Sequence, residues 1–248
     1  MENARIKNPS FVAKAGFFTA ILSAFIAVLS GMGTRFEVWD FHAGLTMLRW
    51  AAFGGLAATV LSLVGIFLAF GTVAMRALAW AVLGFFLGII LVAVPLNWLR
   101  TAKNLPLIHD ISTDTVNPPQ FIEVLPLRKD ALNSFHYGGR IVAEQQRMAY
   151  PDILPLTMAV STAVAFQRAL AVGRGMGWKI IDENQDEGRI EAVATTFWFG
   201  FRDDIVIRIV KSDSGSRVDV RSASRVGISD MGTNAKRIRK FLNLMRKP

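Results

Sequence analysis

Three long uncharged runs dominate the first hundred residues of the chain. Residues 15–34 carry no charge, and two further runs follow at 50–75 and 77–99, separated only by Arg76. In an α-helix about 20 apolar residues rise roughly 30 Å, which is the thickness of the hydrocarbon core of a bilayer. The pattern therefore predicts three transmembrane helices, over about residues 15–33, 48–71 and 77–99, with a tight turn between the last two.

The pattern changes after residue 99. Residues 100–155, here called the arm, show no sustained period and contain six prolines, which favour extended backbone. The arm also carries many apolar side chains, so we expect it to wrap around the soluble domain instead of hanging free. A short helix is predicted within it at about 140–149.

Residues 156–248 combine two helical patterns with strand-like runs. Apolar residues recur at helical spacing from Pro155 to Leu170, and the glycine-rich segment 173–177 ends that helix. Four strands are then predicted at 178–182, 189–199, 203–211 and 217–225, separated by turn-forming residues, and a last helix begins near Met231. The predicted fold is an α+β domain, in the order helix, four-stranded antiparallel sheet, helix, preceded by three transmembrane α-helices.

Alternation along the four strands predicts two unlike faces. One face is apolar and should pack against the helices, and it carries Ile190, Ala192, Ala194, Ile205, Ile207, Ile209, Val218 and Val220. The opposite face carries charges at Arg189, Glu191, Asp204, Arg208, Asp219, Arg221 and Arg225. We expect these charges to pair across neighbouring strands on an exposed face.

Composition supports a membrane half and a soluble half. Hydrophobic residues make up 52% of the 248 residues and the mean hydropathy is +0.37. Residues 1–99 hold nine charges, whereas the remainder holds 22 basic and 16 acidic residues, a net charge of +6. Such an excess favours anionic surfaces such as lipid headgroups, and a membrane tether speaks against a nucleic-acid partner. The absence of cysteine excludes disulfides, thiolate metal sites and a cysteine nucleophile.

Basic residues near the spans predict the orientation. Arg5, Lys7 and Lys14 precede the first span, and Arg76 lies in the turn between the second and third. Cytoplasmic segments are enriched in such residues, which favours a cytoplasmic N-terminus and, after three crossings, a soluble half outside the cytoplasm. In the third span, Gly84 and Gly88 form a GxxxG pattern that permits close helix packing, either within the bundle or in a homo-oligomer.

The polar stretch from Arg221 to Ile238 is the candidate ligand site. It joins a strand to a helix N-terminus, where backbone N–H groups and arginines favour an anion such as a phosphate, a carboxylate or a sugar acid. The candidate residues are Arg221, Ser222, Ser224, Arg225, Ser229, Asp230, Asn234 and Arg237. The alternative is a structural one, in which the same groups form a helix cap and a buried network that holds the arm.

The segment HDISTD within the arm supports that stretch. Its polar residues are His109, Asp110, Ser112 and Asp114. Imidazole and carboxylates can bind metals, but the three histidines of the chain do not pair at a metal-binding spacing, so we expect turn hydrogen bonds and neither a metal nor a cofactor. The neighbouring carboxylates Asp203 and Asp204 are expected to form ion pairs, although together with Asp110 and Asp114 they offer acids and bases to a hydrolase. None of the serines lies in GxSxG, and the sequence assigns no catalytic residue.

Several long runs resemble a known family. They are GWKIIDENQDEGRIEAVATTFWFGFRDDIVIRI from Gly177, VDVRSASRVGISDMGTNAKRIRKFL from Val218, IHDISTDTVNPPQF from Ile108 and AYPDILPL from Ala149. Over about residues 105–246 the chain resembles the domain of unknown function family 1499. The resemblance implies a bacterial domain, often membrane-associated or exported, without an established activity.

Together these features predict a multi-pass protein of the bacterial inner membrane with a periplasmic domain. Its parts are expected at 1–99 (membrane), 100–155 (arm) and 156–248 (α+β domain). The expected function is binding or scaffolding for an anionic or amphipathic component of the cell envelope, or for a partner membrane protein. The alternative is an envelope-associated hydrolase that uses the carboxylates of HDISTD or of the Asp203–Asp204 pair.

Overall fold

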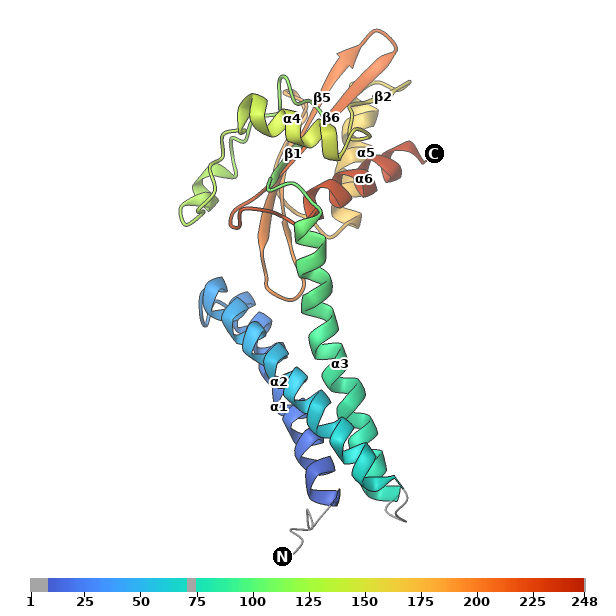
Figure 1. Ribbon diagram of the computed structural model, residues 1–248. Helices are drawn as coiled ribbons and strands as arrows, with labels where there is room; N and C mark the ends of the chain where they lie inside the picture. The colour runs from blue at the N-terminus through green and yellow to red at the C-terminus, as the bar shows by residue number, and fades with distance from the viewer. Residues whose placement is uncertain (1–8, 71–74, 248) are drawn as a thin grey trace, which may run out of the picture. The chain divides into compact units, whose positions relative to one another are not determined.

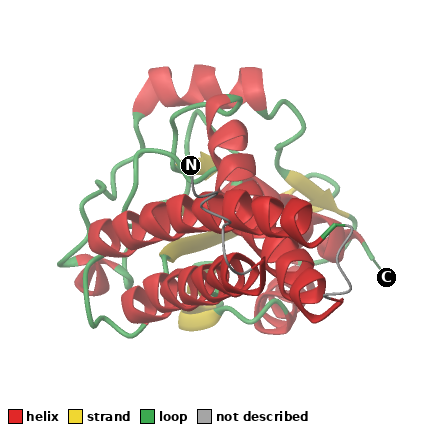
Figure 2. Cartoon of the chain, turned by 60° about the horizontal axis from the view of Figure 1, so that its bottom comes forward, coloured by secondary structure: helices red, strands yellow, loops and turns green. Residues whose placement is uncertain are grey.

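The computed structural model describes residues 9–70 and 75–247. The chain divides into two compact units, one formed by Met1–Arg100 with the short segment Phe197–Gly200 and the other by Thr101–Thr196 with Phe201–Pro248. Figure 2 distinguishes the helices and strands within these units.

The first unit contains three helices, α1 (Pro9–Arg35), α2 (Phe41–Ala69) and α3 (Met75–Lys103) (Figure 1). Each is long and apolar enough to cross a bilayer, with mean hydropathies of 2.0 to 2.7, so the three predicted long apolar helices are confirmed. All begin before the predicted boundaries because caps and polar ends extend a helix past its apolar run. Asp40, for example, accepts hydrogen bonds from the N–H groups of His42 and Ala43 and starts α2. Arg5, Lys7 and the predicted turn after residue 70 lie outside the described residues.

Small residues let the three helices approach closely. A Cβ atom on Gly84 would lie 2.9 Å from Cα of Phe17 in α1, and one on Gly88 would lie 2.7 Å from the carbonyl oxygen of Gly55 in α2. The predicted close packing within the bundle is confirmed. Residues of the chain's own helices contact this face at Gly84 and Gly88, and a homo-oligomer through the same face stays a prediction.

The second unit contains one antiparallel sheet, which confirms the predicted α+β class. Its strands are β1 (Asp110–Ser112), β2 (Leu156–Met158), β3 (Lys179–Asn184), β4 (Arg189–Thr195), β5 (Arg202–Ser212) and β6 (Gly215–Ser224). The order is β1-β6-β5-β4-β3, and β2 pairs with another part of β6. The sheet thus has six strands where four were predicted, because β1 and β2 have three residues each and show no alternation in sequence.

The helix predicted from Pro155 begins later. Residues Leu156–Met158 pair with Ser216–Val218 as β2, and helix α5 covers Thr162–Gly175. Ser161 fixes this start because its hydroxyl accepts a hydrogen bond from the N–H of Val164 at 3.3 Å. The apolar period read at Leu156 and Val160 therefore belongs to a strand and a turn.

The apolar face of the sheet packs under two helices, as predicted. α5 and α6 (Thr233–Arg246) cover this side, here called the helix-covered face (Figure 1). Ile190, Ile207 and Val220 are fully buried there with Phe166 and Phe241. This cluster is the main hydrophobic core of the unit.

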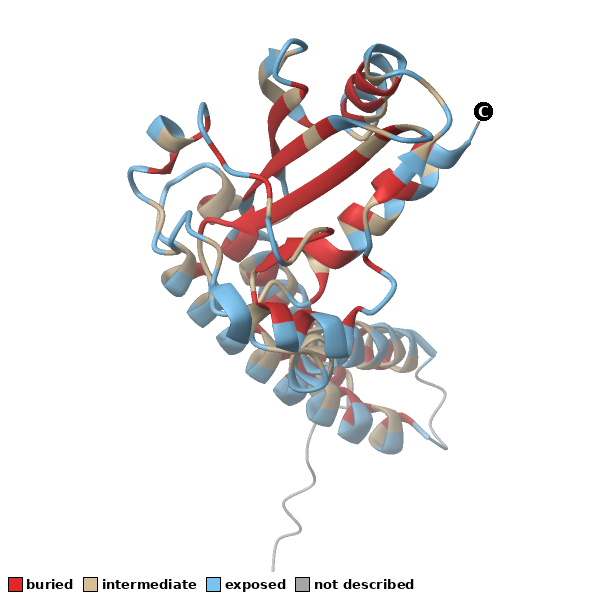
Figure 3. Cartoon of the chain, turned by 90° about the horizontal axis from the view of Figure 1, so that it is seen from above, coloured by how far each residue is buried: buried red, intermediate tan, exposed pale blue. Residues whose placement is uncertain are grey.

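The charged face of the sheet was predicted to be exposed, and this prediction is wrong. Phe121 and Val124 of the arm pack on Val193, Val206 and Ala223, so we call it the arm-covered face. Glu191, Asp204, Asp219, Arg221 and Arg225 are buried on it, whereas Arg208 stays partly exposed. Figure 3 shows how much of the sheet is buried. The arm contains two short elements, the 3-10 helix η1 (Leu125–Arg128) and helix α4 (Gly139–Ala149), and α4 confirms the helix predicted at 140–149.

Candidate functional site

The eight residues predicted to bind an anion do not come together in one site. Successive side chains of a strand point to opposite faces. Arg221 and Arg225 therefore lie on the arm-covered face, whereas Ser222 and Ser224 contact Asn234 of α6 on the helix-covered face. The sheet separates the two halves of the predicted cluster.

Arg221 is fully buried and its donors are occupied. Its guanidinium binds the carboxylate of Asp110, with Nη2 to Oδ2 at 2.7 Å and Nε to Oδ1 at 3.0 Å. It also donates to the carbonyl oxygens of Pro119 and Phe135 and lies 4.6 Å from the ring centroid of Phe121. Asp110 thus takes the position that we predicted for an external anion.

The other charges of the arm-covered face are paired as well. Asp204 binds both Arg225, at 2.8 Å, and Arg128 of η1. Asp114 and Asp219 each bind both Arg208 and Arg217, at 2.8–3.1 Å. Asp110, Asp114 and Arg128 of this network come from the arm, so the arm supplies counter-charges together with its apolar cover.

The segment HDISTD behaves as a structural segment. Asp114 forms the predicted turn by accepting hydrogen bonds from the N–H groups of Val116 and Asn117. Partial burial acts to raise the pKa of Asp114, but these two amides and the guanidinium groups of Arg217 and Arg208 outweigh it and lower the pKa.

The remaining polar groups of HDISTD are also held by local contacts. The hydroxyl of Ser112 donates to the carbonyl oxygen of Asp114, and Nδ1 of His109 lies 3.4 Å from the carbonyl oxygen of Ile228. Within residues 9–70 and 75–247, no three histidines or carboxylates gather in a geometry that could hold a metal ion.

A second polar network caps α6 on the helix-covered face. The carboxylate of Asp230 accepts hydrogen bonds from the N–H groups of Gly232, at 2.9 Å, and Asn234, at 2.7 Å, as expected for a cap. Burial raises the pKa of Asp230 against the effect of these two amides. The side chain of Asn234 links this cap to β6 through Ser222 and Ser224.

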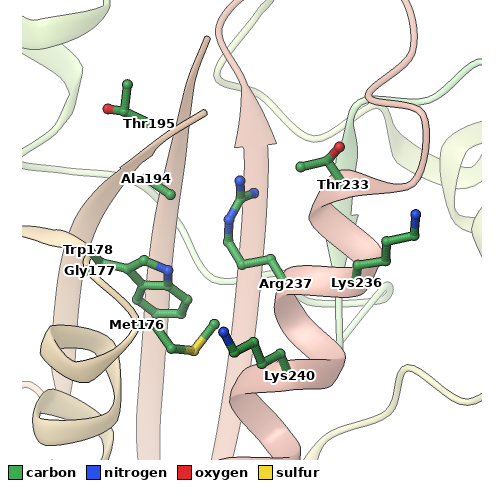
Figure 4. Close-up of a pocket in the computed structure, with 9 residues that line it drawn as sticks. All are labelled: Met176, Gly177, Trp178, Ala194, Thr195, Thr233, Lys236, Arg237 and Lys240. Atoms are coloured by element: carbon green, nitrogen blue, oxygen red, sulfur yellow. The ribbon is translucent and has the colours of Figure 1, made fainter. Parts of the chain in front are cut away.

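Beside this network lies a pocket of about 300 Å³ (Figure 4). One wall comes from the segment before β3 and from the end of β4, and the opposite wall is the first half of α6. The lining residues are Met176, Gly177, Trp178, Ala194, Thr195, Thr233, Lys236, Arg237 and Lys240. The pocket therefore combines an apolar wall with a basic wall.

The basic wall carries one arginine that forms an ion pair and two exposed lysines. Arg237 binds Asp203, with Nη2 to Oδ2 at 2.6 Å, and also the hydroxyl of Ser222, so its charge is compensated. Lys236 and Lys240 are exposed, one helical turn apart, and neither has a carboxylate partner within the described part of the chain.

The apolar wall is rigid. The indole of Trp178 is only 7% exposed and stacks on Phe241 of α6, with ring centroids 5.3 Å apart. Ala194 is also buried, and Met176 is half-buried. The pocket can therefore hold an anion against the lysines and an apolar group against the indole.

Sequence reasoning found only part of this pocket. Among the predicted site residues, Arg237 alone lines it, and neither Lys236 nor Lys240 is one of them. Lys236 and Lys240 are four residues apart, which places both on one face of the helix, and this spacing can be read from the sequence. Nothing in the sequence indicates that Trp178 lies opposite them, because its position follows from its stacking on Phe241 of α6, more than 60 residues later in the chain.

Comparison with known proteins identifies a family whose model matches the chain. Residues 110–245 match the family model of the protein of unknown function DUF1499, which agrees with the resemblance seen in the sequence. No curated protein matches the chain. The matched region includes β1, the arm from there onward and both walls of the pocket.

Proposed function

The chain belongs to the DUF1499 family of proteins of unknown function, and we propose that it is a membrane-anchored binding protein whose pocket between β4 and α6 holds an anionic ligand. The observation that carries this proposal is the pair of uncompensated lysines, Lys236 and Lys240, facing a fixed apolar wall. Two ammonium groups one helical turn apart attract a phosphate, a sulfate or a carboxylate.

The residues that line the pocket indicate which class of ligand it can bind. Trp178 and Met176 offer an apolar surface beside the cations, and the lining threonines, Thr195 and Thr233, carry hydroxyls that can bond an anion. A pocket with this lining fits an anion that carries an apolar group. The ligand class is thus an anionic amphiphile of the cell envelope.

Binding is favoured over hydrolysis. The carboxylates of the rival proposal are Asp110, Asp114, Asp203 and Asp204, and each forms an ion pair with at least one arginine. A general base must be within reach of a substrate and able to take a proton. Carboxylates tied to guanidinium groups, three of them buried, are poorly suited to that task.

The double variant Lys236→Ala with Lys240→Ala tests the proposal in the full chain, held in micelles of an uncharged detergent. The probes are inorganic phosphate and hexyl phosphate, titrated by calorimetry. Exposed ion pairs contribute about 0.5–1 kcal/mol each, so both losses together should weaken binding about tenfold. Hexyl phosphate should bind more tightly than phosphate if the apolar wall takes part.

The matched control is Lys129→Ala with Lys211→Ala, which removes the same charge from exposed positions outside the pocket. Its affinity for both probes should equal that of the unchanged chain. Equal weakening in both double variants would assign the binding to net charge alone and would overturn the proposal. Absence of binding by the unchanged chain would overturn it too.

We also propose that the soluble unit lies outside the cytoplasm, in the periplasm of a bacterial inner membrane. The basic residues before α1 and at the start of α3 support this orientation. An anionic amphiphile of the envelope would then be on the same side of the membrane as the pocket.

A further inference from the structure

Two neighbouring loops of the soluble unit carry large apolar side chains in solvent. Leu107 follows the end of α3, and Ile228 and Met231 lie in the loop before α6. Their side chains are 67%, 74% and 37% exposed, respectively. Single exposed apolar residues are common on protein surfaces, but residues gathered from two loops that are fixed together form a surface.

Hydrogen bonds fix the two loops side by side. The N–H of Asp230 donates to the carbonyl oxygen of Ile108 at 3.3 Å, and the hydroxyl of Ser229 donates to the carbonyl oxygen of Pro106 at 3.3 Å. Both bonds lie next to the exposed side chains in sequence. These hydrogen bonds hold the two loops in a fixed arrangement. We call their three exposed apolar residues, Leu107, Ile228 and Met231, the loop surface.

The chain itself keeps the loop surface close to the membrane. The apolar run of α3 ends at Leu99 and the helix ends at Lys103, about 6 Å further along its axis. The headgroup layer on each side of the hydrocarbon core is roughly 5–8 Å thick. Lys103 therefore lies within or at the edge of that layer, and Leu107 follows it by four residues, a span of at most about 14 Å.

We propose that the loop surface inserts into the headgroup layer of the same bilayer that α3 crosses. Apolar side chains at the boundary between headgroups and acyl chains gain from burial, as they do in proteins that bind membranes peripherally. The exposed Lys103 beside them suits an anionic lipid surface. This proposal does not depend on the pocket, because none of the three residues lines it.

The test uses the absence of cysteine from the chain. A single cysteine is introduced as Leu107→Cys or Ile228→Cys and labelled with a nitroxide, in the full chain in nanodiscs of phosphatidylethanolamine and phosphatidylglycerol. The control is Ser214→Cys in the exposed turn between β5 and β6, at the opposite end of β6 from the loop surface. Thermal unfolding of each labelled chain checks that the fold is retained.

The readout is the ratio of nitroxide collisions with oxygen, which concentrates in lipid, to collisions with a water-soluble nickel chelate. Labels at 107 and 228 should give a higher ratio than the label at 214. A ratio at both positions equal to that at 214 would overturn the proposal. Spin–spin broadening at 228 with a ratio equal to that at 214 would assign the surface to a second copy of the chain, and would overturn it too.

Discussion

Arg221 is a buried cation whose partner, Asp110, lies 111 residues earlier in the chain. Removing either charge from water is expensive, and only the mutual attraction and the added hydrogen bonds offset that cost. The pair therefore contributes less to stability than its geometry suggests, while the loss of one partner is costly.

The variant Asp110→Ala should lower the free energy of unfolding by about 3–5 kcal/mol, because it leaves the guanidinium of Arg221 buried without a counter-charge. The double variant Asp110→Ala with Arg221→Met should recover much of this loss. Denaturant unfolding of the full chain in micelles, followed by near-ultraviolet circular dichroism, measures both. Strictly additive losses would contradict the prediction, since additivity means that the two side chains do not interact.

For single residues, the sequence indicates which side chains carry charge but not which of them form ion pairs with one another. Arg221, Arg225 and Asp204 were expected to pair across neighbouring strands, and Asp204 of β5 does so with Arg225, which directly follows β6. Arg221 instead pairs with the arm, because the arm folds over the sheet and brings Asp110 beside it. Contacts between segments so far apart have no periodicity that would reveal them.

Among the elements, the three membrane helices depend on glycines at their contacts. A valine at position 88 would place its Cβ against the backbone oxygen of Gly55 and against Thr59. Gly88→Val should therefore destabilise the bundle by about 1–3 kcal/mol, as overpacking does elsewhere. The measurement is the temperature of aggregation in detergent.

The control for Gly88→Val is Ala79→Val, which introduces the same side chain at an exposed position of the same helix. Its aggregation temperature should stay close to that of the unchanged chain. If both variants lower the aggregation temperature equally, the valine side chain itself and not the helix contact would be responsible for the loss.

Long elements were predictable because their patterns repeat. The three spans, the four longer strands, α4 and the last helix all show a clear period or an uncharged run. β1 and β2 were missed because three residues are too few to alternate, and the start of α5 was misplaced because Pro155 is compatible with a helix start. The pocket was missed because its two walls are far apart in sequence.

The orientation of the whole molecule is a prediction that fusions can test. Alkaline phosphatase joined after Lys247 should be active, since it works only outside the cytoplasm, and green fluorescent protein at the same position should stay dark. A third fusion directly before Arg76 should show the reverse pattern, because the proposed orientation places this segment in the cytoplasm. A fluorescent fusion after Lys247 would place the soluble unit in the cytoplasm and contradict the proposed orientation.

The two short strands β1 and β2 have a consequence for the order of folding. β1 and β2 leave the ribosome well before β6, yet both take β6 as their partner. The amide of Gln146 meanwhile bonds both the N–H and the carbonyl oxygen of Ser112, much as a neighbouring strand would. Pairing over such sequence separations is intrinsically slow. The pairing of β1 and β2 is therefore completed only when nearly the last segment of the chain is available.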